Sequence, residues 1–481
     1  TITATMTSAT KIAALQSTPR FDGCICLIVG IQLRRLCDVG HQALTSASDS
    51  VSFSRRTSTE MHPMLSSSAP RRPWHTPLRA TLALGVVVAL AGCAAPSPGT
   101  ATNFSTWDSV VTAADGQTVN LWMFGGDEQG NAYIDDVLAP AAAREGVNLN
   151  RVPVTDTKDA LNRVLSELQA GRTDDGTVDL VWVNGDNFRT GKEAGAWLCD
   201  WTAMLPNMAN TSTTDPLLTS DFGTPVDGCE APWSKAQFSI AYNAAVVTNP
   251  PATVGGILDW AQANPGRFTY PAPPDFTGSA FVRQVLYSVS GGYQNVPAEY
   301  STDAFDTLTP ELYQVLSELA PSLWRGGDTY PADSTQLNKL YAEGQIDMTI
   351  TYGPATLTKL VEDGTYPPET RVLELTDGTL GNASFLAIPS NAAHQAGAMV
   401  VANLALSVEQ QVAKANPGTW GQFTVLDLSK LTSIEQQQFA DLPQSTVVPS
   451  FDVLSRNANP ELSAAWVPAL DEGWRTRVPT R

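Results

Sequence analysis

The chain has 481 residues and carries 29 Lys and Arg against 48 Asp and Glu, for a net charge of −19. Residues 93–481 alone hold 20 basic and 44 acidic side chains, a net charge of −24. This acidity argues against binding to nucleic acid, because Lys and Arg dominate contacts with phosphates. The sequence has four histidines, and His394 is the one that follows residue 92, so we expect no catalytic triad, metal site or cofactor.

Residues 61–92 have the features of an export signal. A basic segment, 71–79, precedes an apolar run, 82–90, that is shorter than the roughly 20 residues of a transmembrane helix. The run ends in a Leu-Ala-Gly-Cys sequence at Cys93, which resembles the lipobox of bacterial lipoproteins. That resemblance implies lipidation of Cys93, with 93–104 as a tether. A buried helix is the alternative, but the run has no polar face and a basic flank on one side only.

Residues 1–60 precede Met61 and Met64, the natural start positions for such a signal. We expect these residues to be a mis-called upstream extension. The Ser- and Thr-rich stretch 45–59 agrees with this expectation, whereas the apolar segment 24–29 leaves a genuine N-terminal domain open.

Strands and helices alternate after the tether. The hydrophobic pattern predicts strands over 119–124, 149–154 and 178–183, and helices over 133–138 and 159–170. Such alternation is typical of a parallel sheet covered on both faces by helices, in which ligands bind beyond the carboxyl ends of the strands.

The cysteines that follow Cys93 are Cys199 and Cys229, and Cys24, Cys26 and Cys37 lie upstream. In an exported chain such a pair predicts one disulfide, which stabilises by about 3 kcal/mol for a loop of this length. Metal binding is the alternative, but no histidine lies near either cysteine in the sequence.

Strands and helices alternate again after residue 232. The segment 268–271 leads, as a strand would, into a helix that should start near Ala280, and a strand over 346–351 ends at Tyr352. The 389 residues from Cys93 onward exceed what one core usually holds, so we expect two lobes.

Two extended apolar segments, 232–242 and 382–389, are the candidate hinge strands between the lobes. The expected boundaries are 105–232 and 384–440 for the first lobe, and 233–383 and 441–481 for the second.

Three loops at predicted strand ends are candidates for ligand contact, because such loops present free N–H groups at the start of a helix. The predicted contacts from these loops are Gly125, Gly126, Asp127, Asn184, Gly185, Asn187, Phe276, Thr277, Gly278 and Ser279. Capping of a helix by Asp127, Thr277 or Ser279, and a simple turn at Asn184 and Gly185, are the alternatives.

Two aromatic residues, Trp233 and Tyr352, are further candidates because both should lie at the edge of a cleft and could stack on a ligand. Packing in the core is the alternative for each and is favoured for Trp233.

Together the motifs resemble the YnjB-like branch of the family 1 extracellular solute-binding proteins over about residues 105–430. They are 124–127, 179–190, 232–233, 270–278 and 388–392. The resemblance implies an α/β, two-lobed Venus-flytrap fold of the type 2 periplasmic binding proteins, with a mixed sheet flanked by helices in each lobe. It implies a small-molecule ligand, a permease dimer and a cytoplasmic ATPase as partners, and no catalysis. We expect a monomer, anchored by lipid at the outer face of the cytoplasmic membrane.

Other functions remain open at this point. A secreted lipoprotein carbohydrate-active enzyme would use paired carboxylates from Asp127, Asp179, Asp186 and Asp275, but acidic residues are so abundant that such pairs arise by chance. A cysteine transferase would need Cys199 or Cys229 free, and an adhesion or sensor module could share both lipobox and fold. The sequence does not identify the ligand, and we expect a small polar or cationic molecule.

Overall fold

The computed structural model describes residues 99–100 and 104–478, which fall within one compact unit. The predicted export signal (61–92), the lipidated Cys93 and the extension 1–60 lie outside the described residues. Among the described residues, no helix combines the length and the apolar character needed to cross a membrane.

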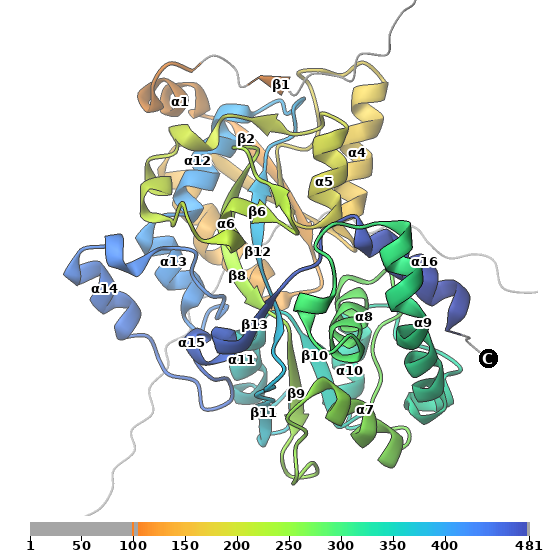
Figure 1. The fold of residues 1–481 in the computed structure, drawn as a ribbon. Helices are drawn as coiled ribbons and strands as arrows, with labels where there is room; N and C mark the ends of the chain where they lie inside the picture. The colour runs from red at the N-terminus through yellow and green to blue at the C-terminus, as the bar shows by residue number, and fades with distance from the viewer. Residues whose placement is uncertain (1–98, 101–103, 479–481) are drawn as a thin grey trace, which may run out of the picture. The chain divides into compact units, whose positions relative to one another are not determined.

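The larger sheet has six strands in the described part of the chain, in the order β13-β12-β4-β2-β3, with β8 paired to β12 (Figure 1). Its strands are β2 (Thr118–Phe124), β3 (Asn148–Val154), β4 (Leu180–Val183), β8 (Glu230–Gln237), β12 (Thr379–Ala387) and β13 (Ala458–Pro460). β2 is parallel to β3 and β4, whereas β12 is antiparallel to both β4 and β8. The sheet is therefore mixed.

Helices pack on both faces of this sheet. Alternate residues of β2, namely Val119, Leu121 and Met123, pack with one group of helices, while Val181 and Val183 of β4 pack with the other. The first group is α1 (Trp107–Ala114), α2 (Glu128–Tyr133), the π-helix η1 (Ile134–Leu138), α3 (Ala139–Arg144), α12 (Gln395–Ala405) and α13 (Val408–Ala415). The second group is α4 (Thr157–Gln169) and α5 (Asp186–Glu193).

The second sheet has the order β10-β9-β11, with strands β9 (Ser239–Asn243), β10 (Met348–Thr351) and β11 (Thr370–Val372). Both outer strands are antiparallel to β9, unlike the parallel sheet that the alternation predicts. The reason is that β9 continues directly from β8, so the crossing strand sets its direction. The helices of this part are α7 (Val254–Ala263), α8 (Phe276–Val289), α9 (Thr302–Leu319), α10 (Ser334–Ala342), α11 (Leu357–Glu362) and α16 (Trp466–Arg477).

Shorter elements join these layers. They are β1 (Gly99–Thr100), β5 (Leu198–Cys199), α6 (Pro216–Thr219), β6 (Ser220–Asp221), β7 (Thr224–Pro225), α14 (Ser433–Ala440) and α15 (Phe451–Leu454). The 3-10 turns are η2 (Thr202–Met204), η3 (Pro206–Asn210), η4 (Tyr293–Asn295), η5 (Ala320–Ser322), η6 (Trp324–Gly327), η7 (Pro354–Thr356), η8 (Leu428–Lys430) and η9 (Ser455–Asn457). β1 pairs with β5, so part of the expected tether is a strand.

The chain passes between the sheets from β8 to β9 and from β11 to β12. The predicted hinge segment 232–242 spans β8 and β9, and 382–389 begins in β12 and ends two residues beyond it. β8 runs into β9 through Phe238, whose N–H donates to the Leu380 carbonyl of β12 (2.8 Å). β8 and β12 lie side by side at the centre of Figure 1 and pair along most of their length. Their register shifts between Ser384 and Phe385, where Trp233 is the extra residue of a β-bulge.

Two differences from the sequence prediction concern the second region. The segment 268–271 is not a strand, and the helix expected near Ala280 begins four residues earlier, at Phe276. The earlier start has a local cause, because the Asp275 side chain accepts hydrogen bonds from the N–H groups of Thr277 and Gly278.

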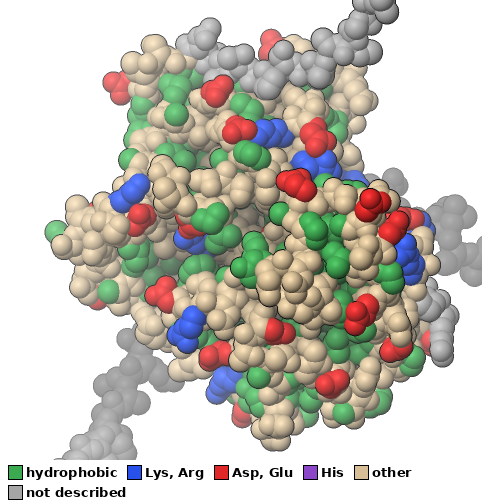
Figure 2. Space-filling model, viewed as in Figure 1, with side chains coloured by type: hydrophobic (Ala, Val, Ile, Leu, Met, Phe, Trp, Pro, Cys, Tyr) green, Lys and Arg blue, Asp and Glu red, His purple; other side chains and the backbone are tan. Residues whose placement is uncertain are grey.

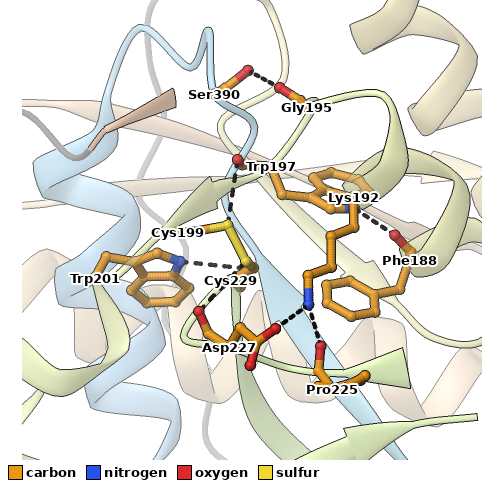
Figure 3. The surroundings of a disulfide bond; sticks show 10 residues. All are labelled: Phe188, Lys192, Gly195, Trp197, Cys199, Trp201, Pro225, Asp227, Cys229 and Ser390. Atoms are coloured by element: carbon orange, nitrogen blue, oxygen red, sulfur yellow. Dashed lines mark hydrogen bonds and ion pairs between the residues drawn. A yellow bond between two sulfur atoms is a disulfide. The ribbon is translucent and has the colours of Figure 1, made fainter. Parts of the chain in front are cut away.

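A disulfide bond joins Cys199 of β5 to Cys229, the residue before β8 (Figure 3). The loop that it closes contains α6 and the β6–β7 hairpin. Further contacts fix the base of this loop: the Trp201 indole N–H donates to the Cys229 carbonyl (3.4 Å), and Lys192 pairs with Asp227 (2.7 Å). The hairpin is therefore held firmly to the larger sheet.

Candidate functional site

The loops after β2 and β3 form one edge of the candidate site. The Gly125 N–H donates to the Val154 carbonyl (2.9 Å), which ties the two loops together. A β-carbon on Gly125 would lie 2.6 Å from Cβ of Pro153, so any larger residue would push the loops apart. Gly126, the next residue, is exposed.

Asp127 caps helix α2. Its Oδ1 accepts from the Gly130 N–H (3.0 Å), and its Oδ2 accepts from the Trp420 indole N–H (2.7 Å). Burial raises the pKa of Asp127 above its ordinary value, and these two hydrogen bonds oppose that shift. Both carboxylate oxygens are thus engaged inside the protein, as the capping alternative describes.

The loop after β4 leads into α5 and is held by a hydrogen bond to a buried aspartate. Gly185 has a φ of +64°, and its N–H donates to Oδ2 of the buried Asp221 (2.7 Å). Burial, followed by the nearby charge of Glu461, raises the pKa of Asp221 to about 8. The half-buried side-chain amides of Asn184 and Asn187 have no hydrogen-bond partner among the described residues. These two amides are therefore available to a ligand.

The start of α8 forms the facing wall. Asp275 accepts from the N–H groups of Thr277 and Gly278 (2.9 Å each), and burial raises the pKa of Asp275 to about 6. The Ser279 hydroxyl donates to Asp471 (2.7 Å). A β-carbon on Gly278 would lie 2.0 Å from the Pro271 carbonyl oxygen, which makes glycine a packing requirement. Thr277, Gly278 and Ser279 are all buried.

Phe276 and Tyr352 provide the aromatic surface of this wall. Phe276 is 39% exposed, and its ring lies 5.0 Å from that of the half-buried Tyr352. The Tyr352 hydroxyl donates to Oε1 of Glu461 (2.5 Å). Burial, then the neighbouring Glu461, raises the pKa of Tyr352 well above its ordinary value, so this phenol stays protonated. Its ring is held in place and can serve as a platform.

Trp233 is fully buried and packs in the first core. Its ring lies 5.3 Å from Trp182 and 5.3 Å from Trp420, in edge-on arrangements. Its carbonyl accepts from Gln411 Nε2 (3.1 Å) and from the buried Nζ of Lys414. Burial lowers the pKa of Lys414 well below its ordinary value. In this arrangement Trp233 touches other aromatic rings, as the core-packing alternative describes.

A cavity of about 600 Å³, in the size range of small-molecule sites, lies between the loops after β2 and β3 and the start of α10. The α8 wall with Phe276 and Tyr352 is not part of its lining. Residues from the first sheet and from the start of α10 line it, among them Gly125, Gly126, Thr155, Asp333, Thr335 and Lys339. A β-carbon on Gly126 would lie 2.7 Å from the Thr335 hydroxyl, so the two walls touch at this point. Neither Thr155 nor Thr335 has a side-chain hydrogen bond within the described ranges.

The four carboxylates of the enzyme alternative do not form a pair around an open space. Asp179 is fully buried and accepts from the N–H groups of Asn120 (2.9 Å) and His394 (3.0 Å). Asp186 is bound to Arg189 (2.7 Å), while Asp127 and Asp275 cap helices. Across the residues that the structure describes, no cluster of three or more His, Cys, Asp or Glu could hold a metal.

Two sheets joined by crossing strands, with a cavity between the walls that they carry, define a two-lobed α/β binding protein. The model of the family described as bacterial extracellular solute-binding protein matches residues 136–443. Protein YnjB of Escherichia coli (strain K12) is 36% identical over 385 residues, covering 79% of this chain and 96% of that protein. The chain therefore belongs to the bacterial extracellular solute-binding protein family.

Solved structures confirm the predicted fold. A putative spermidine/putrescine ABC transporter protein from Listeria monocytogenes superposes with a TM-score of 0.53 at 14% identity, over 74% of this chain and 98% of that one. The periplasmic binding protein AfuA from Actinobacillus pleuropneumoniae gives 0.53 at 12% identity, over 75% and 98%. A periplasmic thiamin binding protein gives 0.51 at 14% identity, over 75% and 96%.

Family membership decides between the functions left open by the sequence. The family to which the chain belongs consists of extracellular solute-binding proteins and not of enzymes, so the carbohydrate-active alternative is wrong. The extracytoplasmic location follows from the same membership.

Sequence reasoning missed Phe222, Arg283, Glu461 and Thr335. Phe222 is followed by glycine in a two-residue turn, which is the one local signal that could have singled it out. The other three residues lie on α8, on the segment after β13 and on α10, which come together only in the folded chain. No local pattern in the sequence singles these residues out.

Proposed function

We propose that this chain is the capture subunit of an ABC importer, which binds a small polar molecule between two lobes and delivers it to a permease dimer driven by a cytoplasmic ATPase. The observation that carries the proposal is the cavity of about 600 Å³ between walls built on different sheets. Thr335 of α10 lines this cavity and its hydroxyl has no hydrogen-bond partner within the described residues. Asn184, after β4, and Asn187, in the first turn of α5, lie outside that lining and offer further side-chain amides without partners in the same part of the chain.

Closure of two lobes is the proposed mechanism of capture. The lobes comprise 105–232 with 384–440, and 233–383 with 441–481. Motion about the paired strands β8 and β12 would bring the loop at Asn184 against the wall at Phe276. A ligand that touches both walls favours the closed form by the free energy of its second set of contacts.

The proposed ligand is neutral or cationic. Residues 93–481 have a net charge of −24, which disfavours a strongly anionic molecule. Figure 2 shows acidic side chains spread over one face of the molecule among apolar and basic ones, so the charge acts as a general field there. The names of structural neighbours mention spermidine and putrescine, thiamin and fructose 6-phosphate, which gives a panel of probes of different charge.

The proposed anchor is a lipid on Cys93, which keeps a monomer at the outer face of the cytoplasmic membrane. The motif at 90–93 supports this proposal, as does the basic segment before the apolar run. A Cys93→Ser variant should lose acylation and move from the membrane to the soluble fraction. Unchanged partitioning into detergent would contradict the anchor while leaving the binding function untouched.

A thermal-shift screen with putrescine, spermidine, thiamin and fructose 6-phosphate tests the binding function. A compound at 100 times its dissociation constant should stabilise the protein by about 2.7 kcal/mol. Thr335→Val should reduce this shift, because it removes a free hydroxyl from the cavity wall. Thr307→Val, at an exposed site on α9, is the matched control and should leave the shift unchanged. An equal loss in both variants would contradict the assignment of the cavity.

A further inference from the structure

The turn between β6 and β7 has an unusual residue at its tip. Phe222 and Gly223 form the two-residue loop, with φ values of +45° and +76°. Such a turn favours Asn-Gly, because both residues must adopt a conformation that a side chain with a β-carbon disfavours. A bulky aromatic residue at this position therefore needs contacts elsewhere to hold it.

Those contacts lie on both sides of the ring. The guanidinium carbon of Arg283 is 5.3 Å from the ring centroid of Phe222, and the Phe276 ring is 6.3 Å away. A β-carbon on Gly185 would lie 3.5 Å from the Phe222 ring, so the ring covers this glycine. The Phe222 carbonyl accepts from the Ala464 N–H (2.8 Å), and the side chain is 5% exposed.

The partners belong to different halves of the fold. Gly185 follows β4 of the larger sheet, whereas Arg283 lies in α8, whose apolar residues pack in the second core. Ala464 lies two residues before Trp466, which is in that same core. The Arg283 guanidinium is fixed by a buried ion pair with Glu461 (2.9 Å). Phe222 thus bridges the first half to a rigid surface of the second.

The β6–β7 turn belongs to a loop whose two ends are fixed by a disulfide and an ion pair. It lies within the loop closed by the disulfide between Cys199 and Cys229, which Figure 3 shows with the Lys192 to Asp227 ion pair beside it. Because the base of this loop is tied to the first half, separation of the halves would pull the Phe222 ring away from Arg283 and not unfold the loop.

We propose that Phe222 is a positioning residue for ligand capture, on a latch formed by the turn Asp221–Gly223 that holds the first wall closed against the second. The latch sets the ratio of open to closed forms and thereby the apparent affinity for any ligand that needs both walls. The inference rests on the proposed function, because a latch requires two halves that separate.

Amide hydrogen exchange at Ala464 tests the latch, since this N–H is protected by the Phe222 carbonyl. Phe222→Ala keeps the carbonyl but removes the ring, and should speed exchange at Ala464 by about thirtyfold, the size expected for losing a desolvated cation–π contact. Exchange at the Trp466 N–H, which donates to Ser463 within its own turn, should not change. Phe222→Tyr should restore the wild-type rate, and Phe439→Ala on α14 is the matched control.

A cysteine pair provides a test that does not depend on the alanine variant. A β-carbon on Gly223 would lie 3.4 Å from Cβ of Ser463, close to the Cβ separation of a disulfide. The oxidised Gly223→Cys/Ser463→Cys variant should exchange more slowly at Ala464 than either single variant. Its radius of gyration should equal or fall below that of the single variants.

The outcomes separate the latch from the proposed closure. Faster exchange at Ala464 in Phe222→Ala, with Trp466 unchanged and slowing in the oxidised pair, supports the latch. If the pair slows exchange but Phe222→Ala matches wild type, the halves separate and the latch alone is wrong. A parallel rise at Ala464 and Trp466 in Phe222→Ala also overturns the latch, since it reports general loosening. If neither variant changes exchange or scattering, the halves do not separate, and the proposed closure fails with the latch.

Discussion

The loops 184–187 and 275–279 look alike in sequence but differ in what they leave available. Each has a glycine among polar residues at the start of a helix, and each is held by an aspartate, the buried Asp221 or the half-buried Asp275. In the second loop two polar side chains are engaged within the protein, because Asp275 accepts from two N–H groups and Ser279 donates to Asp471. In the first loop the amides of Asn184 and Asn187 are without partners in the described part of the chain.

A sequence pattern can therefore locate such a loop, but it does not show whether the loop's side chains form hydrogen bonds within the protein. The second loop acts mainly as a support, which presents Phe276 and anchors Arg283. The first loop leaves two partly exposed side-chain amides unpaired among the described residues. Substitutions in the second loop should therefore affect folding, whereas those in the first should affect binding.

The largest effect is expected at Arg283, which supports the second loop. Arg283→Met leaves the carboxylate of Glu461 buried with one partner fewer, and breaking a buried ion pair typically costs about 3–5 kcal/mol. Urea unfolding measures this cost. Arg475→Met removes an exposed ion pair with Glu472 and should change little. A double variant, Arg283→Met/Glu461→Gln, should regain stability; equal losses in single and double variants would contradict the assigned pair.

Glycine-to-alanine substitutions compare the two loops directly. Gly278→Ala places a β-carbon 2.0 Å from the Pro271 oxygen and should cost about 3 kcal/mol, as overpacking in a core does. Gly185→Ala meets the Phe222 ring at an ordinary 3.5 Å, so its cost should be the roughly 2 kcal/mol of a backbone conformation, φ +64° and ψ −133°, that residues with a β-carbon rarely adopt. Thermal unfolding of both variants ranks them, and a reversed order would show that the loops do not differ as described.

The two supporting aspartates predict a pH dependence. Folded-state pKa values of about 8 for Asp221 and about 6 for Asp275 lie above the ordinary value, so the folded protein binds more protons than the unfolded chain. These two groups make their whole contribution to the free energy of unfolding below about pH 4. The contribution of Asp275 is lost as the pH rises to about 6, and that of Asp221 as the pH rises to about 8.

The loss should be on the order of 1 kcal/mol per pH unit for each group within its window. Asp221→Asn should flatten the decline between pH 6 and 8, and Asp275→Asn the decline between pH 4 and 6. Urea midpoints measured at each pH report this slope. Asp159→Asn, at an exposed site on α4, should leave it as in wild type. A wild-type stability that increases from pH 5 to 8 in a manner sensitive to Asp221→Asn would reverse the predicted sign.

The smallest effect on stability is expected at Asn187. Its amide makes no hydrogen bond within the described residues, so Asn187→Ala should change the unfolding free energy by less than about 0.5 kcal/mol. Ser279→Ala breaks a buried hydrogen bond and should cost about 1–2 kcal/mol. Isothermal titration with whichever probe binds should then show lost affinity for Asn187→Ala. Unchanged affinity there would remove the first loop from the site.

The strands of the first half follow from local patterns. Val119, Leu121 and Met123 alternate along β2 and pack on one face, as a half-buried strand requires. The sequence allows Asp275 to be predicted as a helix cap. Its carboxylate accepts from two N–H groups, and α8 therefore starts at Phe276. This arrangement depends on the geometry of the turn that precedes Asp275.

The long-range contacts of the site could not be predicted. Trp233 looks like any aromatic residue near a cleft, and its burial follows from packing against Trp182 and Trp420, which are distant in sequence. The bridge from Phe222 to Arg283 joins residues 61 positions apart and depends on the closeness of two separate cores. Periodicity within one segment carries no information about such contacts.

Small-angle scattering with and without a bound compound tests the central claim most directly. The compound with the largest thermal shift would be added at saturation to the purified protein. Capture between two walls predicts a smaller radius of gyration when the compound is bound, with a reduced response in Asn187→Ala at the same concentration. An unchanged radius of gyration under saturating compound would contradict capture by closure of the two lobes.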